Sequence, residues 1–167
     1  MSSQILSEPS GPDIVSNYSV DITVLHEAAR CVGSATDSKE SVNKMLRLMS
    51  EMLGLNRGRV LLKDDTTGGL VIKYSYGLTE DQVARGRYKS GEGITGRVMD
   101  TRQVAVIQNV DEERNFLFKA VDREILPDGV VSYLAVPIFN DQDCIGVLAA
   151  HRLRMRPRSV SYTHLRA

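Results

Sequence analysis

Two long apolar segments near the C-terminal end of the sequence constrain the fold more than any other feature. Residues 130–139 and 144–153 are rich in Val, Leu, Ile and Ala, and only the polar residues 140–143 separate them. A parallel pair needs a crossover of about a dozen residues or more, so this link requires an antiparallel pair. The same argument applies to residues 60–62 and 70–76, which a short stretch rich in Asp, Thr and Gly separates. The sequence therefore predicts an antiparallel sheet and disfavours a doubly wound parallel one.

Helical periodicity dominates the sequence before these strands. Apolar residues recur at helical spacing over residues 22–32, and Gly33 is suited to end that helix. A second helix is predicted between Asp37, which forms a capping-box pattern with Glu40, and Gly54. Two helices followed by strands indicate an α+β fold.

The middle of the chain alternates short elements with loops. Thr79 and Gln82 can cap a short helix, and a further helix is expected over residues 93–99. Residues 104–107 read as a short strand, and residues 111–125 as a charged, partly helical connection. The predicted order is helix, helix, strand, strand, helix, strand, helix, strand, strand.

Length and composition indicate one ordinary soluble domain. The chain has 167 residues, of which 42% are hydrophobic and 25% charged, as in average globular proteins. Residues 1–18 are expected to be a disordered leader, because they are rich in Ser and lack hydrophobic periodicity. Residues 19–153 are expected to form the domain, and residues 154–167 a disordered basic tail of non-native appearance.

Charge and hydropathy disfavour several classes of partner. Residues 152–167 hold five of the 21 basic residues and no acidic one, which leaves 16 basic against 21 acidic residues in the body. Direct nucleic-acid binding needs clustered Lys and Arg, so it is not expected. The sequence has no apolar run of the ~18–20 residues that span a bilayer and no recognisable signal peptide, which predicts a cytoplasmic protein without a membrane partner.

The segment Gly91-Glu92-Gly93-Ile94-Thr95-Gly96 matches the G-x-G-x-x-G pattern of dinucleotide-binding sites. That fingerprint opens a parallel βαβ unit directly after a buried strand, whereas the expected topology here is antiparallel. We therefore interpret the segment as a glycine-rich helix start. Its exposed N–H groups could bind an anion or a carbonyl oxygen, or the glycines could serve packing alone.

The sequence contains neither a recognisable metal-site motif nor a familiar catalytic motif. Cys31 and Cys144 have no second cysteine or histidine at ligand spacing, so no metal or cofactor is expected. Kinase-type, G-x-S-x-G and H-E-x-x-H motifs are missing from the sequence. Tyr74 and Tyr76 alternate along one strand and either line a pocket or cover a half-exposed face.

Three segments together resemble the signature of GAF domains. They are residues 91–98 (Gly-Glu-Gly-Ile-Thr-Gly-Arg-Val), 132–138 (Ser-Tyr-Leu-Ala-Val-Pro-Ile) and 145–148 (Ile-Gly-Val-Leu). The similarity covers roughly residues 20–153 and is greatest to the N-terminal sensor of nitrogenase-gene activators, which work with the sigma-54 form of RNA polymerase. It implies a central antiparallel sheet with N-terminal helices on one face and a ligand-pocket lid of helix and loops on the other.

The resemblance also implies a function. In that family the GAF domain controls an AAA+ ATPase, which this chain lacks, and some members respond to 2-oxoglutarate. The chain also departs from the family, because a basic tail stands where the last GAF helix is expected. It lacks the N-K-x-F-D-E pattern of cyclic-nucleotide GAF domains, so a cyclic nucleotide is disfavoured.

Our first hypothesis is therefore a non-catalytic sensor of a small carboxylate such as 2-oxoglutarate, with the sheet as floor and the helix at Gly93 and residues 109–125 as lid. Arg97 is the expected charge partner. The expected ligand-binding residues are Tyr74, Tyr76, Gly93, Ile94, Thr95, Arg97, Phe116, Ser132, Leu134 and Val136.

Two alternatives stay open at this point. A GAF-type methionine sulfoxide reductase would need a reactive thiolate and a resolving cysteine near the pocket. A ligand-free dimerisation module would pair the first helix with its copy, and a homodimer is expected under the sensor hypothesis as well.

Overall fold

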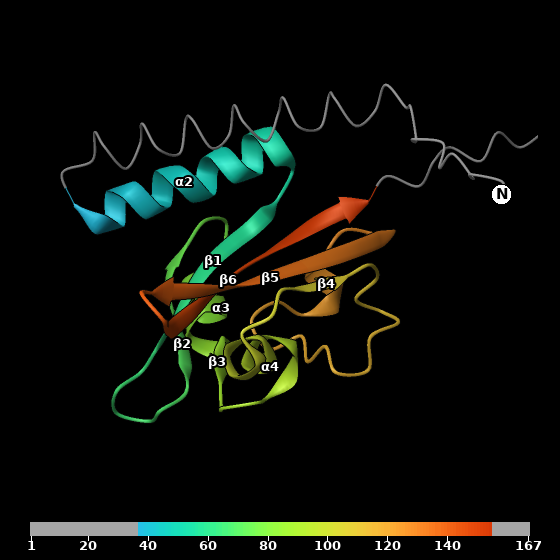
Figure 1. The fold of residues 1–167 in the computed structure, drawn as a ribbon. Helices are drawn as coiled ribbons and strands as arrows, with labels where there is room; N and C mark the ends of the chain where they lie inside the picture. The colour runs from blue at the N-terminus through green and yellow to red at the C-terminus, as the bar shows by residue number, and fades with distance from the viewer. Residues whose placement is uncertain (1–36, 155–167) are drawn as a thin grey trace, which may run out of the picture.

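The computed structural model describes residues 37–154 and consists of one six-stranded sheet with helices on both faces (Figure 1). The strand order is β3-β2-β1-β6-β5-β4, and every neighbouring pair is antiparallel. The structure thus confirms the predicted α+β class and antiparallel sheet. The leader at 1–18, the helix expected over 22–32 and the tail after residue 154 lie outside the described residues.

The elements follow the predicted order with small additions. They are α2 (Ser38–Leu53), β1 (Asn56–Lys63), β2 (Leu70–Ser75), α3 (Glu80–Arg85), β3 (Arg87–Tyr88), α4 (Gly93–Thr101), β4 (Ala105–Ile107), the 3-10 helix η1 (Arg123–Ile125), β5 (Val130–Asn140) and β6 (Asp143–Arg154). Within residues 37–154, no helix is long and apolar enough to cross a membrane.

Local sequence signals determine where α2 begins and ends. The Asp37 carboxylate accepts a hydrogen bond from the Glu40 N–H at 2.7 Å, which satisfies one of the unpaired donors of the first turn. Gly54 ends the helix in the left-handed conformation, with φ of 65°, and its N–H donates to the carbonyl of Ser50. The predicted helix limits are therefore confirmed. Thr79 and Gln82 likewise form the predicted capping box of α3.

The predicted C-terminal hairpin is the longest pairing in the sheet. β5 and β6 pair from Val130 opposite Arg154 to Asn140 opposite Asp143, with one register shift between Ile138 and Phe139, and Asp141 and Gln142 make the turn. β6 also pairs with β1 along its other edge, so it is a central strand. This double pairing fixes which face of the sheet each β6 side chain occupies.

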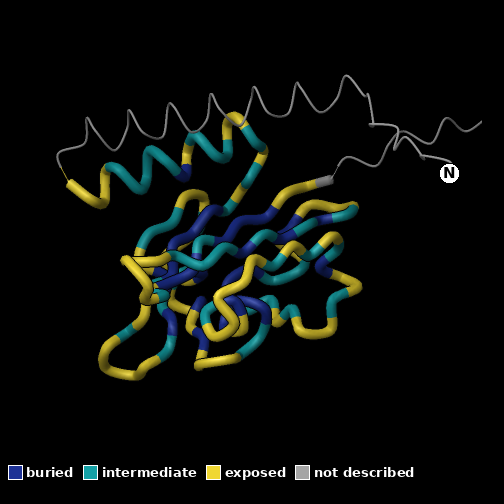
Figure 2. The backbone as a smooth tube through the Cα atoms, in the orientation of Figure 1, coloured by how far each residue is buried: buried dark blue, intermediate teal, exposed yellow. Residues whose placement is uncertain are grey.

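The two faces of the sheet are covered by different elements (Figure 1). Helix α2 lies across one face, while α4 and the connection that follows β4 lie against the other. The largest buried cluster is on the α4 side, and α2 has one fully buried residue among those described, Leu46 (Figure 2). The buried cluster contains Leu61, Leu70, Ile72, Tyr88, Ile94, Val98, Val110, Ala120, Val121, Leu126, Val131, Tyr133, Ala135, Val147 and Ala149.

Three details differ from the sequence-based expectation. β1 begins at Asn56, because a polar Asn-Arg-Gly-Arg segment that lacks a strand-like apolar pattern pairs with β6. Residues 86–90, whose polar sequence predicts a loop, contain β3, and its two residues pair with Leu70 and Val71. The connection over 111–125 is helical only in η1, and side-chain bonds hold the rest.

We expect the substitution Gly146→Ala to disrupt the centre of the sheet. Gly146 lies between Leu62 of β1 and Ile138 of β5, and a Cβ there would overlap the Leu61 carbonyl oxygen. Backbone cannot move aside as a flexible side chain can, so the free energy of unfolding should fall by roughly 1–3 kcal/mol or more. Denaturant titration measures it.

The neighbouring substitution Ile145→Ala is the control, because the Ile145 side chain is exposed. It should change the free energy of unfolding by less than about 1 kcal/mol. Equal losses in the two variants would show that Gly146 has no special packing role.

Candidate functional site

Four side chains with polar groups meet on the α4 face of the sheet, where the surroundings are otherwise apolar. Arg59 of β1, Thr95 of α4, Tyr133 of β5 and His151 of β6 are each no more than 2% exposed. We call these four residues the buried polar cluster. Polar groups are rarely buried without partners, so their hydrogen bonds are informative.

A bulge in β1 determines the side on which Arg59 lies. The pairing between β1 and β6 shifts between Asn56 and Arg59, and Arg57 adopts a left-handed φ of 51°. After the bulge, Arg59 stands opposite Ala149 and therefore shares a face with the buried cluster. A cation thus occupies a strand position at which the alternation would place an apolar residue.

The Arg59 guanidinium is held by neutral groups. Its Nη1 donates to the Arg57 carbonyl at 3.2 Å and lies 3.4 Å from His151 Nδ1, and its Cζ lies 5.3 Å from the centre of the Tyr133 ring. Arg59 makes no salt bridge within residues 37–154, and its buried Nε has no hydrogen-bond partner there. A buried cation without a counter-ion is costly to the folded state.

Burial keeps His151 neutral. The pKa of its imidazole falls to about 2, first because burial disfavours the charged form and then because Arg59 and Arg57 repel it. Arg59 can only donate, so His151 Nδ1 is the acceptor of their contact and Nε2 carries the proton. That Nε2 is also buried and has no partner among the described residues. Two N–H donors in the cluster therefore lack an acceptor.

Hydroxyl groups complete the cluster toward α4. Thr95 Oγ1 and the Tyr133 hydroxyl lie 2.8 Å apart in a buried hydrogen bond, which joins α4 to β5. Tyr88 of β3 lies beside them, and burial, followed by repulsion from Tyr133, raises the pKa of its hydroxyl to about 12. The Tyr88 hydroxyl is therefore a neutral hydrogen-bond group at ordinary pH.

Residues 109–125, which we call the lid, cover the cluster with aromatic rings. The Phe116 ring packs edge-on against Tyr133 at 4.9 Å and against His151 at 5.9 Å between ring centroids, and Phe118 supports it at 4.7 Å. Phe116 is therefore the side chain of the lid that contacts the cluster directly. Its ring thus packs on the side of the cluster formed by Tyr133 and His151.

Ion pairs around the edge hold the lid in place. Lys119 Nζ lies 2.9 Å from the Glu92 carboxylate at the start of α4, and Arg85 of α3 pairs with Asp122 at 3.0 Å. The pKa of Glu92 is lowered, first by the N–H of Lys89 and then by Lys119. These pairs are partly exposed, so they can break at modest cost.

The structure brings together only part of the predicted ligand-binding set. Thr95 and Phe116 belong to or touch the buried polar cluster, and Ile94 is buried beside them. Gly93 starts α4 with φ of 62°, and Leu117 of the lid lies directly over it. Arg97, the expected charge partner, is exposed on α4.

The other predicted residues lie on the α2 side of the sheet. Along β5, Ser132, Leu134 and Val136 alternate with Val131, Tyr133 and Ala135, and only the second set enters the buried cluster. Tyr74 stands opposite Val60 because a bulge separates it from Ile72, and Tyr76 lines a surface hollow beside α2. These five residues and the cluster therefore occupy opposite faces.

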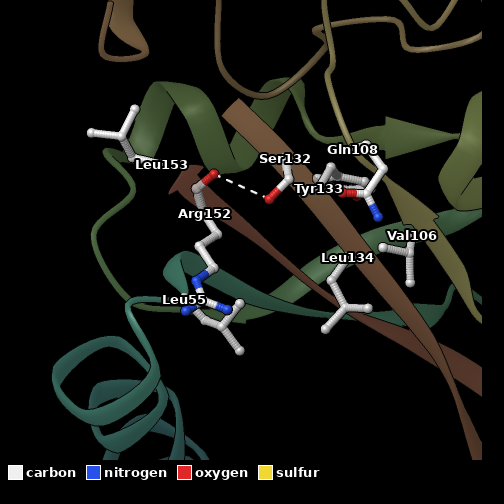
Figure 3. A pocket seen from close by; sticks show the side chains of 8 residues that line it. All are labelled: Leu55, Val106, Gln108, Ser132, Tyr133, Leu134, Arg152 and Leu153. Atoms are coloured by element: carbon white, nitrogen blue, oxygen red, sulfur yellow. Dashed lines mark hydrogen bonds between the residues drawn. The ribbon is translucent and has the colours of Figure 1, made fainter. Parts of the chain in front are cut away.

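Ser132 and Leu134 instead contribute to an open cavity of about 520 Å³ (Figure 3). Its lining residues are Leu55, Val106, Gln108, Ser132, Tyr133, Leu134, Arg152 and Leu153. The Ser132 hydroxyl is already bonded to the Arg152 carbonyl at 3.2 Å, and Arg152 is exposed. The cavity thus offers no buried unpaired donor of the kind found beneath the lid.

Sequence reasoning missed Arg59, Tyr133 and His151. Tyr133 and His151 stand opposite each other on β5 and β6, so the hairpin register could have shown that they share a face. No comparable signal identified Arg59, since its side depends on the β1 bulge. The described residues hold no group of His, Cys, Asp and Glu suited to a metal ion.

Comparison with known proteins agrees with this geometry. The GAF domain family model matches residues 37–166. The Nif-specific regulatory protein of Azospirillum lipoferum is 33% identical over 139 residues, which are 83% of this chain and 22% of that protein. Nitrogen fixation protein VnfA of Azotobacter vinelandii is 32% identical over 133 residues, 79% of this chain and 26% of that protein.

Solved structures show the same fold. The nlh2 GAF domain of A. aeolicus in an inactive state superposes with a TM-score of 0.72 at 24% identity, over 82% of each chain. Free methionine-R-sulfoxide reductase of Neisseria meningitidis, in complex with its substrate, gives 0.64 at 23% identity over 77% of this chain and 71% of that one.

The chain spans only about a quarter of the length of the curated relatives it matches. The family match and the similarity to the Nif regulator nevertheless each cover most of this chain. The family match includes the antiparallel sheet. The chain therefore belongs to the GAF domain family and is similar to the GAF domains of Nif-specific transcription regulators.

Proposed function

We propose that this GAF domain is the small-molecule sensor of a transcription activator of the Nif-regulator type, and that it binds a small carboxylate such as 2-oxoglutarate beneath the lid. The observation that supports a ligand at this place is the buried polar cluster, which holds two N–H donors without acceptors among residues 37–154, beside the ring of Phe116. Such donors favour a ligand rich in acceptor oxygens.

The lid offers a physical route from binding to regulation. A carboxylate can reach the cluster only if Phe116 moves, and that movement strains the pairs between Lys119 and Glu92 and between Arg85 and Asp122. Bound and empty domains would then present different lid surfaces to a downstream AAA+ ATPase. The size of the response is limited by the difference in ligand affinity between the two lid states.

The reductase alternative receives less support from the described residues. Cys144 is the single cysteine among them, and its Sγ lies 3.5 Å from the sulfur of Met99, without a resolving cysteine near it. The reported relatives with more than 30% identity are named as a Nif-specific regulatory protein and a nitrogen fixation protein, whereas the reductase is similar at the level of the fold. We therefore propose a non-enzymatic role in the cytoplasm, and we expect a homodimer.

The first test of this proposal is binding. Calorimetry on the 167-residue chain with 2-oxoglutarate, succinate and an uncharged diester of succinate should give heat with the carboxylates and none with the diester. Bound ligand should raise the melting temperature, because it stabilises only the folded state. If no carboxylate binds to a protein shown to be folded, the sensor proposal in this form is wrong.

The substitution Lys119→Met should loosen the lid without unfolding the domain. Its ion pair with Glu92 is partly exposed, so the free energy of unfolding should fall by less than about 1 kcal/mol. Amide hydrogen exchange in residues 109–125 should become faster, because one attachment of the lid to α4 is lost.

The matched control is Lys44→Met, which removes another partly exposed ion pair, the i,i+4 pair with Glu40 on α2. It should leave exchange in the lid unchanged. Equal exchange in the lid of both variants and the unmodified chain would show that the Lys119 pair does not hold the lid.

A further inference from the structure

We propose that Arg59 and His151 together are the anion receptor of this domain, with Arg59 pairing with the ligand carboxylate and the neutral His151 ring orienting the guanidinium and donating a hydrogen bond to the ligand from Nε2. The inference rests on the proposed function, since it names the residues of the same site.

The orientation of Arg59 leaves its carboxylate-binding edge available. Both of its hydrogen bonds within the described residues use Nη1, one to the Arg57 carbonyl and one to His151 Nδ1. The opposite edge of a guanidinium, formed by Nε and Nη2, accommodates the two oxygens of a carboxylate in parallel hydrogen bonds. Nε on this edge is buried and has no partner. A planar carboxylate is therefore the ligand group that fits this edge.

His151 completes the receptor as a neutral group. Its pKa is lowered to about 2, first by burial and then by repulsion from Arg59 and Arg57. A carboxylate on Arg59 would offset the repulsion, but burial would still disfavour the charged form. Nδ1 of the neutral ring accepts from Arg59 Nη1 and so orients the guanidinium, and the buried Nε2, which has no partner within residues 37–154, is a second donor for the ligand.

The described part of the chain contains no counter-ion for Arg59 beside this pair. The groups facing the pair are Arg57 on β1, Tyr88 on β3, Thr95 on α4, Tyr133 on β5 and Phe116 in the lid. Within residues 37–154, no carboxylate contributes to the shift in the His151 pKa. The Glu92 carboxylate interacts with Tyr88, and it already accepts hydrogen bonds from the Lys89 N–H and from Lys119 Nζ. A ligand is therefore the expected counter-ion.

The substitution Arg59→Met tests the anion receptor. It removes a buried charge that has no counter-ion, so the melting temperature of the ligand-free chain should stay the same or rise. Affinity for 2-oxoglutarate and succinate should fall about tenfold or more, the loss expected for one charge-assisted hydrogen bond. A purely structural arginine would give the opposite result, with a lower melting temperature and unchanged affinity. If Arg59→Met does not fold, Arg59→Lys keeps the charge, and the same loss of affinity is expected because the two-bond geometry is gone.

The matched control is Arg47→Met, which removes an exposed arginine on α2, across the sheet. Its affinity should equal that of the unmodified chain. Arg97→Met distinguishes the earlier candidate, because loss of affinity in that variant and not in Arg59→Met would overturn the inference and place the charge partner on α4.

Proton uptake is a second and independent test. Calorimetry of the unmodified chain at pH 6.0, in two buffers with different ionisation enthalpies, counts the protons taken up on binding. Burial is the first cause of the low His151 pKa and persists in the bound state, so we expect no net uptake at pH 6.0. The substitution His151→Leu removes both the acceptor for Arg59 and the unpaired donor, so affinity for succinate should fall about tenfold. His151→Gln keeps an acceptor and a donor and should lose less.

The outcomes separate the two proposals. Failure of every carboxylate to bind the unmodified chain would overturn the proposed function and with it this inference. Binding that is equally strong in Arg59→Met would overturn the Arg59 assignment and leave the sensor proposal intact. Net proton uptake at pH 6.0, or unchanged affinity in His151→Leu, would overturn the His151 assignment.

Discussion

The pairing of β6 on both of its edges is the constraint on which the rest of the structure depends. With β1 on one side and β5 on the other, each β6 residue is fixed to one face, and its neighbours across the sheet are fixed with it. His151 is thereby placed opposite Tyr133, and both lie on the face that α4 and the lid cover. A shift of one residue in this register would exchange the faces of every side chain. Strand register thus determines which residues meet at the candidate site, and side-chain chemistry then determines what they can bind.

Arg59 shows how a local irregularity adds chemistry to such a sheet. The bulge at Arg57, and not strand alternation alone, determines on which face of the sheet the Arg59 guanidinium lies. The cation is buried among aromatic and hydroxyl groups, where Tyr133 provides a ring face but no acidic residue within 37–154 forms an ion pair with it. Natural proteins retain such costly groups at functional sites more readily than in purely structural cores. The energetic cost of Arg59 is therefore the physical reason to seek an anion at this place.

How much the sequence could predict depends on the range of the interaction. The limits of α2 and α3 follow from caps made within a few residues, and the β5–β6 hairpin follows from its two-residue turn, so all of these were predictable. The candidate site depends on contacts between residues far apart, such as the pair Arg59 and His151, and these were not. The face of β5 was the critical step. Ser132, Leu134 and Val136 look as suitable for a pocket as their neighbours until the pairing with β6 and the cover of α4 show which set is buried.

The lid connects this buried chemistry to the surface of the domain. Phe116 contacts Tyr133 and His151 at its inner side, and Lys119 and Asp122 attach the same segment to α4 and α3 at its outer side. Apolar and aromatic contacts favour a closed lid whether or not an anion is present, whereas Arg59 and His151 favour a ligand that supplies acceptor oxygens. The two tendencies compete for the same space beneath Phe116. Under the proposed function, a ligand would shift this segment between two arrangements, which is the property a regulatory domain needs.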